Sequence, residues 1–162
     1  MERGAWRLTA LGVLIKLALK RRAMPKELTA RRLSPAALIA PCGMNCRLCC
    51  AFLRTRNGCP GCRGDDRGKC KTRVACKIKT CSARRGSFCT DCASFPCQRL
   101  SRLDKRYRTK YGMSMIDNLR RIQTDGIRSF IASERSKWAC PGCGETICVH
   151  KASCLVCGHK WR

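Results

Sequence analysis

The cysteines carry the clearest chemical signal in this chain. Seventeen cysteines occur in 162 residues, twelve of them in residues 42–97 (the cysteine-rich block) and five in residues 140–157. Five Cys-x2-Cys pairs are present, and this spacing places two thiolates on one ion at a tight turn, as in structural zinc sites. The pairs are Cys46/Cys49, Cys59/Cys62, Cys89/Cys92, Cys140/Cys143 and Cys154/Cys157.

A disulfide framework is the alternative use of so many cysteines. Seventeen is an odd number, so a fully disulfide-bonded chain would leave one thiol unpaired. Metal binding is therefore favoured, and thiolate ligands imply a reducing compartment. We expect a cytoplasmic protein.

The strongest signal lies in residues 138–162, which we call the tail. Two Cys-x2-Cys-Gly segments, with ten residues between Cys143 and Cys154, predict a C-terminal zinc ribbon held by Cys140, Cys143, Cys154 and Cys157. The remaining candidates, Cys148, His150 and His159, are interpreted as structural or surface residues.

The cysteine-rich block should supply the ligands of two or three further ions. The spacing does not say which cysteines share an ion. The predicted ligands are Cys42, Cys46, Cys49, Cys59, Cys62, Cys76, Cys81, Cys89, Cys92 and Cys97.

The elements that position these cysteines differ along the chain. The block contains few large apolar side chains, so metal must offset the ordering entropy of its backbone. Residues 98–138 show a helical pattern instead: Gly112 ends a first helix, Ser114 with Asp117 begins a second, and Gly126 separates it from a third.

The predicted fold class is a small metal-stabilised α+β protein: an irregular cysteine-rich domain with short helices, a helical segment and a zinc ribbon. We expect a poorly ordered or amphipathic extension over residues 1–38, a metal-binding domain over 39–137, and the ribbon over 138–162. The apolar run near the N-terminus is too short to span a bilayer, which needs about 20 residues.

The chain is strongly basic, with a formal net charge of +25. Four ions with four thiolates each would lower this to about +17, because each site carries −2. The remaining excess favours contact with nucleic acid or an anionic surface, or is a solvated basic face.

Residues 39–103 resemble the DUF3795 family, a group of small cysteine-rich bacterial and archaeal proteins of unknown function. The resemblance is carried by Cys42-Gly43 with Cys46 and Cys49, the Cys59/Cys62 pair, the Cys76 and Cys81 segment, and Cys89-x2-Cys92-x2-Phe95-Pro96-Cys97. It implies metal binding and suggests no reaction.

The sequence therefore predicts a zinc-binding module for nucleic acid or a protein partner. An iron–sulfur protein is the alternative, because Cys42-x3-Cys46-x2-Cys49 is a three-cysteine cluster spacing, and a thiol-redox protein is another. With two histidines, both in the tail, and no phosphate loop, we expect no catalytic site. The oligomeric state stays open.

Overall fold

The structure, a computed structural model, describes residues 33–162, so most of the expected N-terminal extension lies outside the described residues. Within this range the chain forms helices and isolated antiparallel bridges, but no extended β-strand. The expected α+β class is therefore not confirmed. The helices are α3 (Pro35–Leu38), η1 (Cys46–Leu48), α4 (Lys71–Val74), η2 (Cys89–Asp91), α5 (Gln98–Tyr111), α6 (Met115–Asp125) and α7 (Ile127–Lys137).

The predicted helical segment is confirmed, including its boundaries. Gly112 ends α5 in the left-handed region with φ +62°, where a residue without Cβ is unstrained. The Ser114 hydroxyl oxygen accepts from the Asp117 N–H at 3.0 Å and caps α6. Gly126, with φ +79°, separates α6 from α7.

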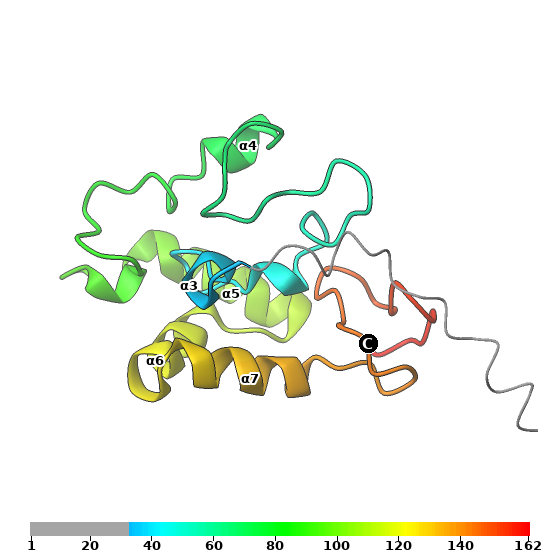
Figure 1. Cartoon of the computed structure of the whole chain (residues 1–162). Coiled ribbons are helices and arrows are strands. Elements are labelled where there is room, and N and C mark those ends of the chain that lie inside the picture. The colour runs from blue at the N-terminus through cyan, green and yellow to red at the C-terminus, as the bar shows by residue number, and fades with distance from the viewer. Residues whose placement is uncertain (1–32) are drawn as a thin grey trace, which may run out of the picture.

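The three longer helices form the packed base of the molecule. Both α5 and α7 pack on α6, and Figure 1 shows α6 and α7 along one edge with α4 at the opposite edge. The tail continues beyond the end of α7. These helices supply half of the largest fully buried side chains: Leu100, Met115, Leu119, Phe130 and Glu134.

The cysteine-rich block is anchored on α6 through its first turn. The Asn118 amide donates to the Gly43 carbonyl oxygen at 3.1 Å. Gly43 has φ +86°, and a Cβ there would lie 2.7 Å from the Met115 carbonyl oxygen. Only glycine therefore fits at this position, and the turn that carries Cys42 lies directly against the helix.

Candidate metal centre

Two knuckles of the same geometry build the cysteine cluster of the tail. In the first, the Gly144 N–H donates to the Cys140 carbonyl oxygen at 2.7 Å, and in the second the Gly158 N–H donates to that of Cys154 at 3.1 Å. Both glycines have positive φ, +74° and +75°. One isolated bridge closes each knuckle, Ala139↔Thr146 and Ser153↔Lys160. Because no strand ladder extends from these bridges, the expected zinc ribbon is not confirmed.

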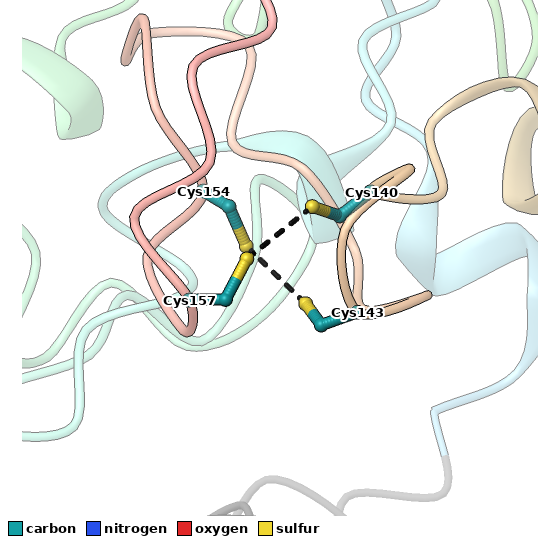
Figure 2. A group of neighbouring side chains, drawn as sticks. All are labelled: Cys140, Cys143, Cys154 and Cys157. Atoms are coloured by element: carbon teal, nitrogen blue, oxygen red, sulfur yellow. Dashed lines mark hydrogen bonds between the residues drawn. The ribbon is translucent and has the colours of Figure 1, made fainter. Parts of the chain in front are cut away.

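The four sulfurs of the two knuckles converge on one point. The Cys140 and Cys157 sulfurs are 3.6 Å apart, those of Cys143 and Cys154 are 3.7 Å apart, and all four lie within 4.8 Å of one another (Figure 2). These separations are well beyond a disulfide bond of about 2.05 Å. Around a tetrahedral ion with metal–sulfur bonds of about 2.3 Å, sulfurs lie about 3.8 Å apart. The cluster could therefore bind one metal ion.

The thiols of this cluster titrate differently from one another. Burial works against the Cys140 thiolate, but the N–H groups of Gly142 and Cys143 and the Cys157 thiol stabilise it, so the pKa of Cys140 is lowered to about 7. The Glu145 N–H favours the Cys143 thiolate, yet burial and the neighbouring sulfurs prevail and raise the pKa of Cys143 to about 12. A divalent ion would replace these protons, because thiols bind metals as thiolates.

The tail is fastened to both the helices and the block. Trp138, at the end of α7, packs edge-on against Trp161 with ring centroids 5.7 Å apart, and its indole N–H donates to Glu134 at 3.0 Å. The Val149 N–H donates to the Leu48 carbonyl oxygen at 3.0 Å. The four-cysteine cluster therefore sits on a packed support.

The cysteines of the block gather less completely. Cys46 and Cys62 form one close pair: the Cys62 N–H donates to the Cys46 sulfur at 3.3 Å. The hydrogen bond between the two thiols lowers the pKa of Cys62 to about 7 and raises that of Cys46. Lys69 and Lys79 also favour the Cys62 thiolate.

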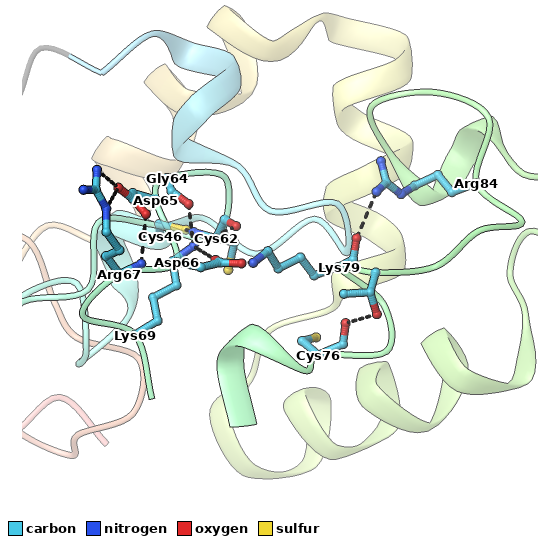
Figure 3. Close-up of polar contacts among 11 residues, drawn as sticks. Cys46, Cys62, Gly64, Asp65, Asp66, Arg67, Lys69, Cys76, Lys79 and Arg84 are labelled. Atoms are coloured by element: carbon cyan, nitrogen blue, oxygen red, sulfur yellow. Dashed lines mark hydrogen bonds and ion pairs between the residues drawn. The ribbon is translucent and has the colours of Figure 1, made fainter. Parts of the chain in front are cut away.

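A polar network holds the loop that follows this pair. The Lys69 ammonium donates to the carbonyl oxygens of Cys62 and Gly64 at 3.3 and 2.7 Å and also to Asp66, which pairs with Lys79 as well (Figure 3). The cationic groups thus lie beside the Cys62 thiol, whose pKa is lowered. Part of the basic excess of the chain therefore lies next to a thiol and would stabilise its thiolate.

Cys42 lies among the other block cysteines. Burial and, to a smaller extent, the nearby sulfurs of Cys62, Cys89 and Cys76 raise the pKa of Cys42 to about 12. The Cys89 N–H donates to the Pro41 carbonyl oxygen at 2.9 Å. Within residues 33–162, however, these thiols do not form a set of three mutually within 4.8 Å. The predicted block ligands outside any such set are Cys42, Cys46, Cys59, Cys62, Cys76, Cys81, Cys89, Cys92 and Cys97.

One further group of three residues does have its ligand atoms within 4.8 Å of one another, and the sequence pattern did not reveal it. Cys49, a predicted ligand, lies with Cys50 and His150 so that their ligand atoms are within 4.8 Å of one another. The pattern assigned Cys50 no ligand role and interpreted His150 as a structural or surface residue. Their partnership spans 100 residues of sequence, and no local spacing encodes it.

The exposed face of α5 is the most basic helical surface. Arg99, Arg102, Lys105 and Arg106 recur at spacings of three and four, so they share one side of the helix, and all are exposed. Among the ion pairs of the described residues, none involves Arg102, Lys105 or Arg106. These three charges are free to meet a polyanion.

No helix in the described part of the chain is long and apolar enough to cross a membrane. No family model, no curated protein and no solved structure matches the chain. The resemblance to the DUF3795 family therefore stays a prediction.

Proposed function

We propose that this chain is a zinc-binding protein whose tail is a minimal zinc ribbon, held by Cys140, Cys143, Cys154 and Cys157. The observation that carries the proposal is the pair of sulfur separations, 3.6 and 3.7 Å, in a set of four thiols. Four thiolates in a tetrahedron are a donor set typical of structural zinc or of iron. With all four positions filled by protein, the ion would organise the tail and would bind no substrate.

Zinc is favoured over an iron–sulfur cluster by the room between the sulfurs. A cluster must fit its own iron and sulfide atoms between the cysteine ligands, so those ligands lie further apart than ligands of one ion. The observed separations suit a single ion. A single iron would fit the same donors, and metal analysis distinguishes it from zinc.

The first experiment is the metal content of the full chain purified anaerobically, with an absorption spectrum of the same sample. Zinc with no visible absorption supports the proposal. Iron with sulfide and a brown colour would replace it by the iron–sulfur alternative. A metal-free protein with seventeen reactive thiols would contradict both the zinc site and the iron–sulfur cluster.

The metal-organised fold would serve as a binding module for nucleic acid. The support is the exposed basic side of α5, where Arg102, Lys105 and Arg106 have no acidic partner in the described residues. Phosphate contacts of this kind dominate the affinity of proteins for nucleic acid and weaken as salt rises. A protein partner with an acidic surface is the alternative.

Binding to a mixed-sequence duplex, followed by fluorescence anisotropy over a salt series, tests this module. We expect log K to fall linearly with log salt, by about 0.9 per phosphate contact. The triple variant R102E/K105E/R106E should bind more weakly and show a shallower slope. The matched control R47E/R54E/R56E makes the same charge change at exposed residues of the block. Equal losses of affinity in both variants would show that only the net charge matters and would contradict α5 as the binding surface.

A further inference from the structure

A second set of metal-ligand side chains joins the block to the tail. Cys49 and Cys50 follow η1 in the block, and His150 lies in the tail, between the two knuckles. The ligand atoms of the three residues lie within 4.8 Å of one another. They share none of the four cysteines of the tail cluster.

Hydrogen bonds fix the orientation of the His150 ring. The Cys50 N–H donates to Nδ1 of His150 at 3.3 Å, so Nδ1 is the unprotonated nitrogen. The proton is then on Nε2, which lies 3.0 Å from the Tyr107 hydroxyl oxygen and donates to it. Edge-on packing against Tyr107 and Tyr111, with centroids 5.7 and 5.0 Å from the imidazole, holds the ring in place.

This arrangement matches the way histidines bind metals in proteins. A ligating histidine almost always donates its other ring N–H to a neighbouring group, which fixes its tautomer and direction. Here Tyr107 is that group. The Nδ1 lone pair accepts from the Cys50 N–H at 3.3 Å, and an ion bound beside the two thiols would take the place of this hydrogen bond.

The two thiols come from a well-ordered turn. The Cys49 N–H donates to the Cys46 carbonyl oxygen at 2.9 Å, which ends η1, and the Cys49 carbonyl oxygen accepts from the N–H groups of Phe52 and Leu53 at 3.0 Å. The hydrogen bond between Val149 and Leu48, at 3.0 Å, brings the tail to this turn immediately before His150. Backbone contacts therefore place all three donors before any ion binds.

We propose that Cys49, Cys50 and His150 bind one divalent ion of the zinc class. Two thiolates and an imidazole are donors that zinc, cobalt and cadmium accept, and three protein ligands leave one tetrahedral position for water or an outside ligand. The site goes beyond the four-cysteine site proposed above. It would remove Cys49 from the Cys42, Cys46, Cys49 grouping that the sequence spacing indicates, and it would tie the tail to the block.

The test uses the full chain loaded with cadmium-113 and labelled with nitrogen-15 at histidine. In the wild type we expect a one-bond coupling between a bound cadmium and Nδ1 of His150, with the proton on Nε2. This measurement needs no substitution, so a folding defect cannot mimic or hide it. A fully loaded protein with no cadmium coupled to a histidine nitrogen overturns the proposal.

A substitution then assigns the site. His150→Asn keeps an acceptor for the Cys50 N–H and removes the nitrogen donor, so we expect loss of one ion per chain and of the coupled resonance only. His159→Asn is the matched control, because His159 is exposed and should change neither. An unchanged ion count in the His150 variant overturns the proposal.

The four-sulfur resonance of the tail is the internal reference in both experiments. If it is present while no nitrogen-coupled resonance appears, this second site is wrong and the four-cysteine site stands. If it is absent while the nitrogen-coupled resonance is present, the four-cysteine site is wrong and the second site stands.

Discussion

The tail and the cysteine-rich block use the same residue type with different outcomes. In the tail, two knuckles bring four sulfurs within 4.8 Å of one another. In the block, ten predicted ligands yield one hydrogen-bonded pair, Cys46 with Cys62, and one cysteine that meets a tail histidine. Both regions are rich in Cys-x2-Cys pairs, so pair spacing alone does not decide how sulfurs assemble.

The difference lies in what connects the pairs. Each tail knuckle is closed by its own bridge and glycine turn, and the ten residues between Cys143 and Cys154 return the chain to the second knuckle. In the block, the path between pairs depends on packing against α6 and on the polar network around Lys69. Local turns therefore set the tail site, whereas tertiary contacts set the positions of the block cysteines.

The largest expected effect is that of Cys143→Ser in the tail. Structural zinc contributes about 10–16 kcal/mol of apparent binding free energy to small zinc folds, and the tail has little core of its own. We expect loss of one ion per chain and a change in tryptophan emission, because Trp138 and Trp161 belong to the same core cluster as Cys140 and Cys154. Metal analysis and fluorescence measure both.

Cys92→Ser makes the same chemical change in the block. It should also lower the ion count, while leaving the tryptophan signal of the tail intact. An unchanged metal content in the Cys143 variant would contradict the tail site, and an unchanged content in the Cys92 variant would contradict its assignment as a block ligand.

The next effect concerns the helical support beneath the block. Leu119 is fully buried on α6 beside Gly43, so Leu119→Ala should cost about 2–5 kcal/mol of unfolding free energy. Urea denaturation of the metal-loaded chain measures this as a lower midpoint at similar slope.

Leu155→Ala is the matched control in the tail. Leu155 lies between two cluster cysteines and is 52% exposed, so its truncation should change the free energy of unfolding by no more than about 0.5 kcal/mol. Similar losses in the two variants would contradict the view that apolar packing supports the block and metal supports the tail.

Two glycines with positive φ give a smaller and more local comparison. Gly144→Ala, in the first knuckle, meets no atom within 4 Å and should cost only the backbone strain of about 1–2 kcal/mol. Gly43→Ala adds a Cβ 2.7 Å from the Met115 carbonyl oxygen and 2.8 Å from Leu119, and overpacking of this kind costs about 1–3 kcal/mol more. In thermal denaturation, Gly43→Ala should have a lower melting temperature than Gly144→Ala. The reverse order would contradict the close approach of the block to α6.

The features that the sequence predicted well are those with local signals. Gly112, Ser114 and Gly126 mark the helix boundaries by backbone conformation and capping, which depend on a few neighbouring residues. The convergence of the four tail sulfurs was predictable for the same reason, because each knuckle is one turn of chain.

The features that sequence reasoning missed depend on distant partners. His150 meets Cys50 across 100 residues, through the contact of Val149 with Leu48. The strands of the expected ribbon are reduced to isolated bridges. The hydrogen bond from the Ile147 N–H to the Trp138 carbonyl oxygen belongs to the Ala139↔Thr146 bridge, but the Val149 N–H beyond it donates to Leu48 and does not extend the pairing. Neither outcome is encoded in spacing.

The smallest structural effect is expected for Cys70→Ser, the block cysteine that no predicted site uses. Cys70 is exposed at the start of α4, beside the Thr72 hydroxyl at 3.2 Å and the Arg73 guanidinium at 3.1 Å. The hydrogen bond from Thr72, the Arg73 N–H and the Arg73 charge lower the pKa of Cys70, so its thiolate persists to lower pH than an ordinary cysteine. We expect unchanged metal content and melting temperature.

The same variant should remove the most reactive thiol of the metal-loaded protein. Thiols bound to an ion are protected, whereas an exposed thiolate reacts readily, so iodoacetamide labelling followed by mass spectrometry should mark Cys70 first. Lowering the pH protonates this thiol and should slow the labelling, but less than for a thiol of ordinary pKa. Loss of an ion in Cys70→Ser would instead show that Cys70 is a metal ligand. The metal sites of the block would then differ from the tail site in the number of cysteine ligands as well as in the chain segments that connect them.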